Sequence, residues 1–218
     1  MPVDLLKPEK IVLTVVLEYL NKNRFFNMKE ILPFIHARFK MSSVNINIMG
    51  IEEILKSLVE KKLLVEGSKL YKDDLLKNHK RRQIYEFINE NPGTYFNKIV
   101  KNLNFSNHVV IWHLSMLLKF NFIKTELLEN HEVYFEFNFD LKHSKLKYFT
   151  SKDRSKRIIE YLKINDIGIT KTKISADLKI HFNTMSKYLD FLEKLNVIIK
   201  KNLSKKILYF LNEDFFEE

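Results

Sequence analysis

Apolar side chains recur every three or four residues in three segments between residues 81 and 123, the spacing of one buried helix face. The positions expected to point inward are Ile84, Phe87 and Ile88, then Ile99, Val100 and Leu103, then Val110, Leu114 and Leu117. Asn91-Pro92-Gly93 interrupts the pattern after the first segment. The pattern therefore predicts three helices with a break after the first.

A strand pattern follows these helices. From Val133 to Phe139, apolar residues alternate with Tyr134, Glu136 and Asn138, which is the period of a half-buried strand. We expect a small β-hairpin to close the unit. The predicted order is a helix, a helix–turn–helix and a hairpin, which is the order of a winged helix.

The same pattern occurs a second time. Residues 81–88 match residues 155–162 at an offset of 74, and residues 99–123 match residues 174–198 at an offset of 75. In the later copy the positions expected to point inward are Ile158, Tyr161, Leu162, Ile174, Leu178, Met185, Leu189 and Leu192. Ile198-Ile199 and the segment 207–211 flank the polar stretch 200–206 and predict its hairpin. A period this long indicates duplicated domains rather than a solenoid.

Residues 81–138 resemble the winged helix-turn-helix domains of archaeal and bacterial transcriptional regulators of the ArsR and MarR type. The residues that carry the resemblance are Asn91-Pro92-Gly93, Ile99, Leu103, Ser106, Val110, Trp112-His113-Leu114, Leu117 and Ile123. Residues 155–212 match the pattern less closely, with Tyr188-Leu189 in place of His-Leu. The resemblance implies a DNA-binding fold, although winged helices also serve as protein-binding modules.

The first 77 residues predict a third, divergent copy. Glu18-Tyr19-Leu20 and the segment 58–64 match the start and end of the other units, with eight or nine extra residues between them. A short hairpin is expected over residues 64–71, with Gly67-Ser68 as its turn. A helical accessory domain is the competing interpretation. The expected fold is mostly α with small β-hairpins (α+β), as tandem winged helix-turn-helix domains over residues 1–77, 78–142 and 143–218.

Composition narrows the class of protein. The 218 residues include 18 Phe but only four Gly and four Pro, so we expect folded domains with little linker. No apolar stretch is long enough to span a membrane, and the N-terminus lacks a signal-peptide pattern. We therefore expect a soluble cytoplasmic, nucleoid-associated protein. The absence of Cys excludes disulfides and thiol catalysis.

Positive charge is concentrated at the C-terminal end of the chain. The net charge is +10 overall, and it is +3 for residues 1–77, +1 for residues 78–142 and +6 for residues 143–218. Residues 143–212 alone carry +10, because four acids lie in the last six residues. A basic surface on one domain suits phosphate binding, although a solvated basic face is the plainer interpretation.

The third helix of the C-terminal unit is the main candidate for reading DNA, because such a helix presents its first half to base edges. Its candidate contacts are Asn183, Thr184, Ser186 and Lys187, and those of the following hairpin are Lys200, Lys201, Lys205 and Lys206. The side chains of Asn, Ser, Thr and Lys hydrogen-bond bases and phosphates.

The middle unit is a weaker candidate for DNA contact. Its candidate residues are Ser106, Asn107, His108, Trp112 and His113, and we expect residues 107, 108, 109, 111, 112 and 113 to be exposed. This helix is more apolar than most DNA-reading faces, and Glu126, Glu129 and Glu132 in its hairpin would repel phosphate. Val109, Ile111 and Trp112 therefore suit contact with another protein surface, such as a homodimer partner, another protein partner or the neighbouring domain, as well as they suit DNA.

No motif indicates an enzyme. His108 and His113 lie five residues apart, which is not the spacing that lets two helical residues bind one metal. The sequence contains neither a GxxxxGK phosphate loop nor a GxSxG elbow. We expect no catalytic residues, no metal and no cofactor. Two hypotheses remain: a transcriptional regulator that binds double-stranded DNA, and a tandem winged-helix scaffold that binds proteins.

Overall fold

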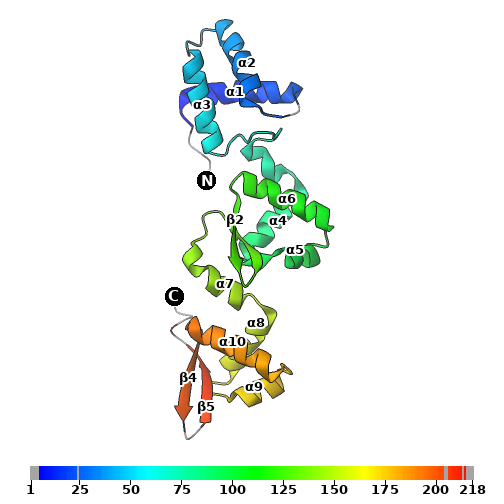
Figure 1. Ribbon diagram of the computed structural model, residues 1–218, viewed down its shortest axis with the longest axis vertical. Helices are drawn as coiled ribbons and strands as arrows, with labels where there is room; N and C mark the ends of the chain where they lie inside the picture. The colour runs from blue at the N-terminus through cyan, green and yellow to red at the C-terminus, as the bar shows by residue number, and fades with distance from the viewer. Residues whose placement is uncertain (1–4, 24, 204–205, 213, 215–218) are drawn as a thin grey trace. The chain divides into compact units, whose positions relative to one another are not determined.

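The computed structural model describes residues 5–23, 25–203, 206–212 and 214, and these form mostly helices with small antiparallel sheets (Figure 1). This architecture confirms the predicted α+β class. The chain forms two compact units, one of Met1–Phe87 with Ile99–Lys124 and one of Ile88–Lys98 with Thr125–Glu218. None of the helices in the described residues is long and apolar enough to cross a membrane.

Three helices form the N-terminal part of the chain: α1 (Lys7–Lys22), α2 (Met28–Lys40) and α3 (Ile48–Glu60). Their apolar faces meet in one core that includes Val12, Val16, Ile31, Ile35, Ile51, Leu55 and Leu58. Asn27 and Asn47 begin α2 and α3, and their side-chain oxygens accept backbone N–H groups of the first turn. These caps satisfy donors that have no partner within the helix.

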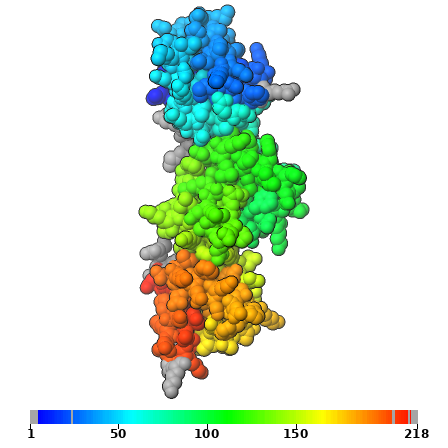
Figure 2. Space-filling model, in the orientation of Figure 1, coloured from blue at the N-terminus to red at the C-terminus, as the bar shows by residue number. Residues whose placement is uncertain are grey.

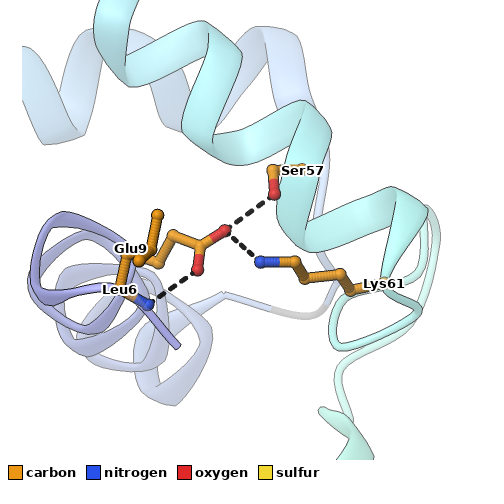
Figure 3. A network of polar contacts seen from close by, with 4 residues as sticks. All are labelled: Leu6, Glu9, Ser57 and Lys61. Carbon is orange, nitrogen blue, oxygen red and sulfur yellow. Dashed lines mark hydrogen bonds and ion pairs between the residues drawn. The ribbon is translucent and has the colours of Figure 1, made fainter. Parts of the chain in front are cut away.

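A buried carboxylate connects α1 to α3 (Figure 3). The Glu9 carboxylate accepts hydrogen bonds from the Leu6 backbone N–H at 3.0 Å, the Ser57 hydroxyl at 2.7 Å and the Lys61 ammonium at 2.5 Å. The bond from Lys61 is the main cause that lowers the pKa of Glu9, against the opposing effect of burial. Glu9 is therefore held in its charged form.

The prediction of a hairpin over residues 64–71 is wrong. All of these residues are described, and none of them is in a strand. The backbone around the predicted turn bonds instead to Phe26, with Phe26 N to Ser68 O at 2.8 Å and Gly67 N to Phe26 O at 2.9 Å. The 3₁₀ helix η1 (Lys72–Lys77) begins directly afterwards, so no length remains for a second strand.

The middle of the chain continues with helices α4, α5 and α6 and a small sheet. The elements are α4 (His79–Glu90), β1 (Thr94–Tyr95), α5 (Phe96–Leu103), α6 (Asn107–Lys119), β2 (Ile123–Leu128) and β3 (His131–Glu136), with strand order β1-β3-β2. The inward positions predicted for α6 are confirmed, because Val110, Leu114 and Leu117 are buried.

The alternation predicted for residues 133–139 is only partly right. Val133, Tyr134 and Phe135 are all buried, so both faces of β3 are covered, and the strand ends at Glu136. Phe137, predicted to point inward, is exposed. A period of two cannot persist where both faces of a strand are covered.

The C-terminal part contains η2 (Leu141–His143), α7 (Ser144–Thr150), α8 (Asp153–Ile164), α9 (Lys171–Asp177), α10 (Phe182–Lys194), β4 (Ile198–Leu203) and β5 (Lys206–Leu211). Its core includes Ile158, Leu162, Ile174, Met185, Leu189, Leu192 and Val197, which confirms most of the predicted inward positions; Tyr161 and Leu178 are only partly buried. On the other side of α10, Phe191 stacks on Phe149 of α7 with ring centroids 4.4 Å apart. The strand β4 extends to Leu203, so part of the predicted polar loop is strand.

The end of the third helix has the same geometry in all three parts. The residue just after its C-cap has a left-handed backbone, with φ of 54° at Lys62, 54° at Asn121 and 57° at Asn196. In each case the next N–H bonds to the carbonyl five residues earlier: Leu63 to Leu58, Phe122 to Leu117 and Val197 to Leu192. This is the Schellman geometry that ends many helices.

Two glycines also occupy matching positions. Gly93 has φ of 81° and Gly168 has φ of 79°, a left-handed conformation in which a side chain is strained. The residue after each glycine pairs with a tyrosine, Thr94 with Tyr134 and Ile169 with Tyr209. The sequence offset of 75 therefore has a counterpart in backbone geometry.

Candidate nucleic-acid interface

The candidate interface is formed by α9, the turn after it, α10 and the β4–β5 hairpin. Thr170 caps α9 through its side chain, and His181 caps α10 by accepting the Asn183 N–H at 3.3 Å. Between the helices, Lys179 has a left-handed φ of 52°, and the Ile180 N–H bonds to the Ser175 carbonyl at 3.0 Å. These contacts hold the two helices in a tight helix–turn–helix.

The first half of α10 is open to solvent on the side opposite its core residues. Asn183 and Lys187 are exposed, and Thr184 and Ser186 are partly exposed. Met185 and Leu189 are fully buried beneath them. The four predicted α10 residues are therefore accessible to solvent. We call the surface formed by these four residues and Phe182 the α10 face.

A lysine from α9 reaches onto the α10 face. The Lys171 ammonium donates to the Ser186 hydroxyl at 3.0 Å and lies 4.2 Å from the centre of the Phe182 ring. Ser186 in turn donates to the Phe182 carbonyl at 3.1 Å. The Ser186 proton is therefore already used, and this hydroxyl can only accept from a further partner.

Lys171 is absent from the residues predicted from the sequence. The available signal was its position at the start of a helix, where a cation opposes the helix dipole. Lys171 forms no ion pair with any carboxylate in the described part of the chain. A lysine that pairs with no carboxylate, and whose charge is opposed by the helix dipole, is a candidate functional residue.

The hairpin beside α10 carries the predicted lysines in different surroundings. Lys200 is 3.9 Å from the Glu193 carboxylate of α10, and Lys201 lies 5.2 Å from the centre of the Phe210 ring. Lys206 is exposed, whereas Lys205 lies outside the described residues. Orange atoms of α10 and red atoms of the hairpin meet at the surface in Figure 2, in agreement with the contact between α10 and β4.

The middle helix α6 presents an apolar surface. Ile111 is 55% exposed and Trp112 is 52% exposed. The guanidinium of Arg81 lies 5.0 Å from the centre of the Trp112 ring, and its Nη1 donates to the Leu75 carbonyl. Ser106, Asn107 and His108 are exposed at the start of this helix, as expected.

The expectation that His113 is exposed is wrong. His113 is only 4% exposed. It lies three residues after Val110 and one before Leu114, which places it on the inward face of the helix. Burial, assisted by Arg81 and Lys80, lowers the pKa of His113 to about 4. A buried neutral ring of this kind does not reach a DNA groove.

The acidic residues of the middle hairpin are partly engaged. Glu129 pairs with Lys152, and Glu132 accepts a hydrogen bond from the Tyr134 hydroxyl at 3.0 Å. Glu126 is partly buried. These three carboxylates cannot neutralise a phosphate. The described residues contain no cluster of His, Cys, Asp or Glu that could hold a metal ion.

The third helices of the three parts therefore differ in chemistry. The exposed start of α3 carries Ile48 and Met49, followed by Glu52 and Glu53. The exposed side of α6 carries Asn107 and His108 at its start and the apolar residues Ile111 and Trp112 after them, whereas the exposed side of α10 carries amide, hydroxyl and ammonium groups. In the described residues, α10 has hydrogen-bonding groups suited to base edges next to a hairpin that bears lysines.

No protein-family model matches the chain. The chain is similar to an uncharacterized HTH-type transcriptional regulator of Methanocaldococcus jannaschii, with 30% identity over 167 residues. The match covers 76% of this chain but 42% of the relative, so the chain spans less than half the length of the regulator it resembles.

Proposed function

We propose that the chain is a DNA-binding transcriptional regulator built from winged-helix units over residues 1–77, 78–142 and 143–218, with the C-terminal unit as its main reader. The observation that carries the proposal is the α10 face, a solvent-open helix start with Asn183 and Lys187 beside a lysine-bearing hairpin. The similarity to an HTH-type transcriptional regulator supports the same function.

The repeated backbone geometry supports the proposal that the N-terminal part is a third winged-helix unit. The left-handed residue and the Schellman bond at the end of α3 match those at the ends of α6 and α10. The hydrogen bonds between Phe26 and residues 67–68 correspond in position to the pairing of Thr94 with Tyr134 and of Ile169 with Tyr209 in the other two units. In this proposal the first unit is a winged helix whose hairpin is reduced to a turn.

In the proposed mechanism, α10 enters the major groove and the hairpin follows the phosphate backbone. Asn183 would then form hydrogen bonds with a base edge, and adenine is the usual partner of an asparagine amide. Lys200, Lys201, Lys205 and Lys206 would neutralise phosphates without reading sequence. We expect the protein to act in the cytoplasm, at the nucleoid, without a cofactor.

The primary test is selection from a pool of random duplexes followed by sequencing. A regulator should enrich a motif, and its affinity should fall steeply with salt. Asn183→Ala should lower the preference for the motif by about fivefold or more, because a bidentate base contact contributes about 1–3 kcal/mol of discrimination. Enrichment of no motif by the wild type would refute sequence-specific reading.

Replacing the four hairpin lysines by alanine gives a matched comparison. This variant should weaken every duplex alike and reduce the slope of log affinity against log salt by up to about 3.6, at about 0.9 for each phosphate that is no longer neutralised. Lys163→Ala removes a charge from α8 and should leave the slope unchanged. An unchanged slope in the four-lysine variant would contradict the proposed role of the hairpin.

The apolar surface of α6 favours a second candidate function, a tandem winged-helix scaffold that binds a protein through Ile111 and Trp112. The partner could be a second copy of the chain, which would also supply a second reader to a regulator. Sedimentation velocity of the wild type and of Ile111→Asp tests the homodimer directly. A dimer that dissociates in Ile111→Asp but not in Ile164→Asp would support it, and a wild-type monomer at micromolar concentration would refute it.

A further inference from the structure

An aromatic ring lies at the very start of α10, on its exposed side. Phe182 is the first residue of the helix and is 45% exposed, whereas the side chains that hold α10 to its core begin at Met185. An exposed phenyl ring loses hydrophobic free energy, and phenylalanine is a mediocre helix former. Phe182 is therefore poorly explained by the stability of the fold alone.

The ring of Phe182 is held in place. The Lys171 ammonium lies 4.2 Å from the ring centre and is itself held by the Ser186 hydroxyl one helical turn further along. A cation over a ring face attracts the ring, and attraction of this kind limits its rotation. Lys171 occupies a position that its own helix disfavours, so the cluster points to a role for the fixed ring itself.

An exposed phenyl ring at the start of such a helix suits one chemical group of the major groove. The major-groove edge of thymine carries a methyl group, and apolar side chains including Phe read it by contact. Residues at the start of a recognition helix are those that reach base edges. Asn183 is adjacent and exposed, and an amide pairs with adenine.

We propose that Phe182, held by Lys171, recognises the 5-methyl group of a thymine in the DNA site. This inference rests on the proposed DNA-binding function and extends it by naming the base chemistry that the helix start reads. Lys171 acts as a positioning residue, because it touches the ring and Ser186 rather than the methyl group. The site is expected to contain an A·T pair beneath the start of α10.

The test replaces each thymine of the selected duplex, one at a time, by deoxyuridine, which differs only by the missing methyl group. At one position, wild-type affinity should fall about fourfold, the effect of one buried methyl-sized group. Phe182→Ala should bind the thymine and deoxyuridine duplexes equally. Lys171→Met keeps the aliphatic stem but removes the cation, and its discrimination should fall below about twofold.

Ile164→Ala is the matched control, because Ile164 is an exposed apolar residue (83%) of the same unit. It should keep the fourfold discrimination, and circular dichroism should show the same folded spectrum for all variants at the temperature of the binding assay. If no deoxyuridine substitution weakens the wild type, or if Phe182→Ala still discriminates, the inference is overturned while the proposed function stands. If the wild type selects no duplex at all, the proposed function fails, and this inference fails with it.

Discussion

The two left-handed glycines share a backbone conformation but differ in their neighbours, so the same substitution at each should have a different energetic cost. Gly93→Ala and Gly168→Ala place the same methyl group on nearly the same backbone, with φ of 81° and 79°. Their neighbours differ. A Cβ at Gly93 would lie 2.9 Å from the backbone N and Cα of Tyr148, whereas a Cβ at Gly168 would lie 2.3 Å from the tip of the Phe210 ring.

The magnitudes follow from these contacts. Both variants pay about 1 kcal/mol for the left-handed conformation of a residue with a side chain. The Phe210 ring can turn aside at a further cost of about 1 kcal/mol, so Gly168→Ala should destabilise its part of the fold by about 2 kcal/mol. The Tyr148 backbone cannot turn aside. Overpacking typically costs about 1–3 kcal/mol, and the upper part of that range applies to a clash with backbone, so Gly93→Ala should cost about 3–4 kcal/mol in total.

Amide hydrogen exchange measures these losses locally, which matters because a chain of several units need not unfold in one step. For Gly168→Ala, the amides of Ile169 and Tyr209 report directly, since they bond to each other's carbonyls at 3.1 and 2.9 Å. Phe210→Ala in the same chain should recover about half of the loss caused by Gly168→Ala. No recovery, or a larger loss in Gly168→Ala than in Gly93→Ala, would refute this account of the two contacts.

Three further predictions concern Glu9, Lys62 and His113. Glu9→Gln should lower the free energy of unfolding of the N-terminal helices by about 1–2 kcal/mol at pH 7, through loss of charged hydrogen bonds. Because the folded pKa of Glu9 is lowered, this contribution is present at neutral pH and is lost as the pH falls through that pKa; urea titrations in which the difference between wild type and variant did not shrink as the pH was lowered would contradict it. Lys62→Gly should stabilise by up to about 1 kcal/mol, because glycine accepts the left-handed φ of 54°, and thermal melting against Lys56→Gly, which should destabilise, checks this. His113, with a folded pKa of about 4 against an ordinary 6.5, should make the fold less stable as the pH falls from 6.5 towards 4, and His113→Leu should flatten that dependence in denaturant titrations.

The sequence predicted the helices that carry periodic apolar residues. Met185, Leu189 and Val110 were expected to point inward, and all three are buried, because one helix face must be covered wherever the period is maintained. The same period also identifies position 113 as inward, three residues after Val110. The prediction that His113 is exposed is therefore at odds with the helical period, and its burial follows from its position on the inward face.

Other features depend on partners far away in the sequence. The absence of a hairpin at residues 64–71 follows from bonds between Phe26 and residues 67–68, about forty residues apart. The contact of the Lys171 ammonium with the Phe182 ring joins two helices, and these become neighbours only after the turn at Lys179 has formed. Local propensity contains no record of such contacts, so they required the folded structure.

Each third helix ends in a left-handed residue, and this shared feature shows where the polypeptide tolerates added length. In the N-terminal part α2 has 13 residues, against 8 in α5 and 7 in α9, yet the backbone at Lys62 adopts the same φ as at Asn121 and Asn196. Growth of a loop before the third helix costs little, since each doubling of loop length adds about 0.6 kcal/mol. After α6 or α10, by contrast, one extra residue would reverse which side chains of the following strand face the interior. A reporter peptide or sensor domain is thus best grafted between α2 and α3, upstream of the left-handed residue.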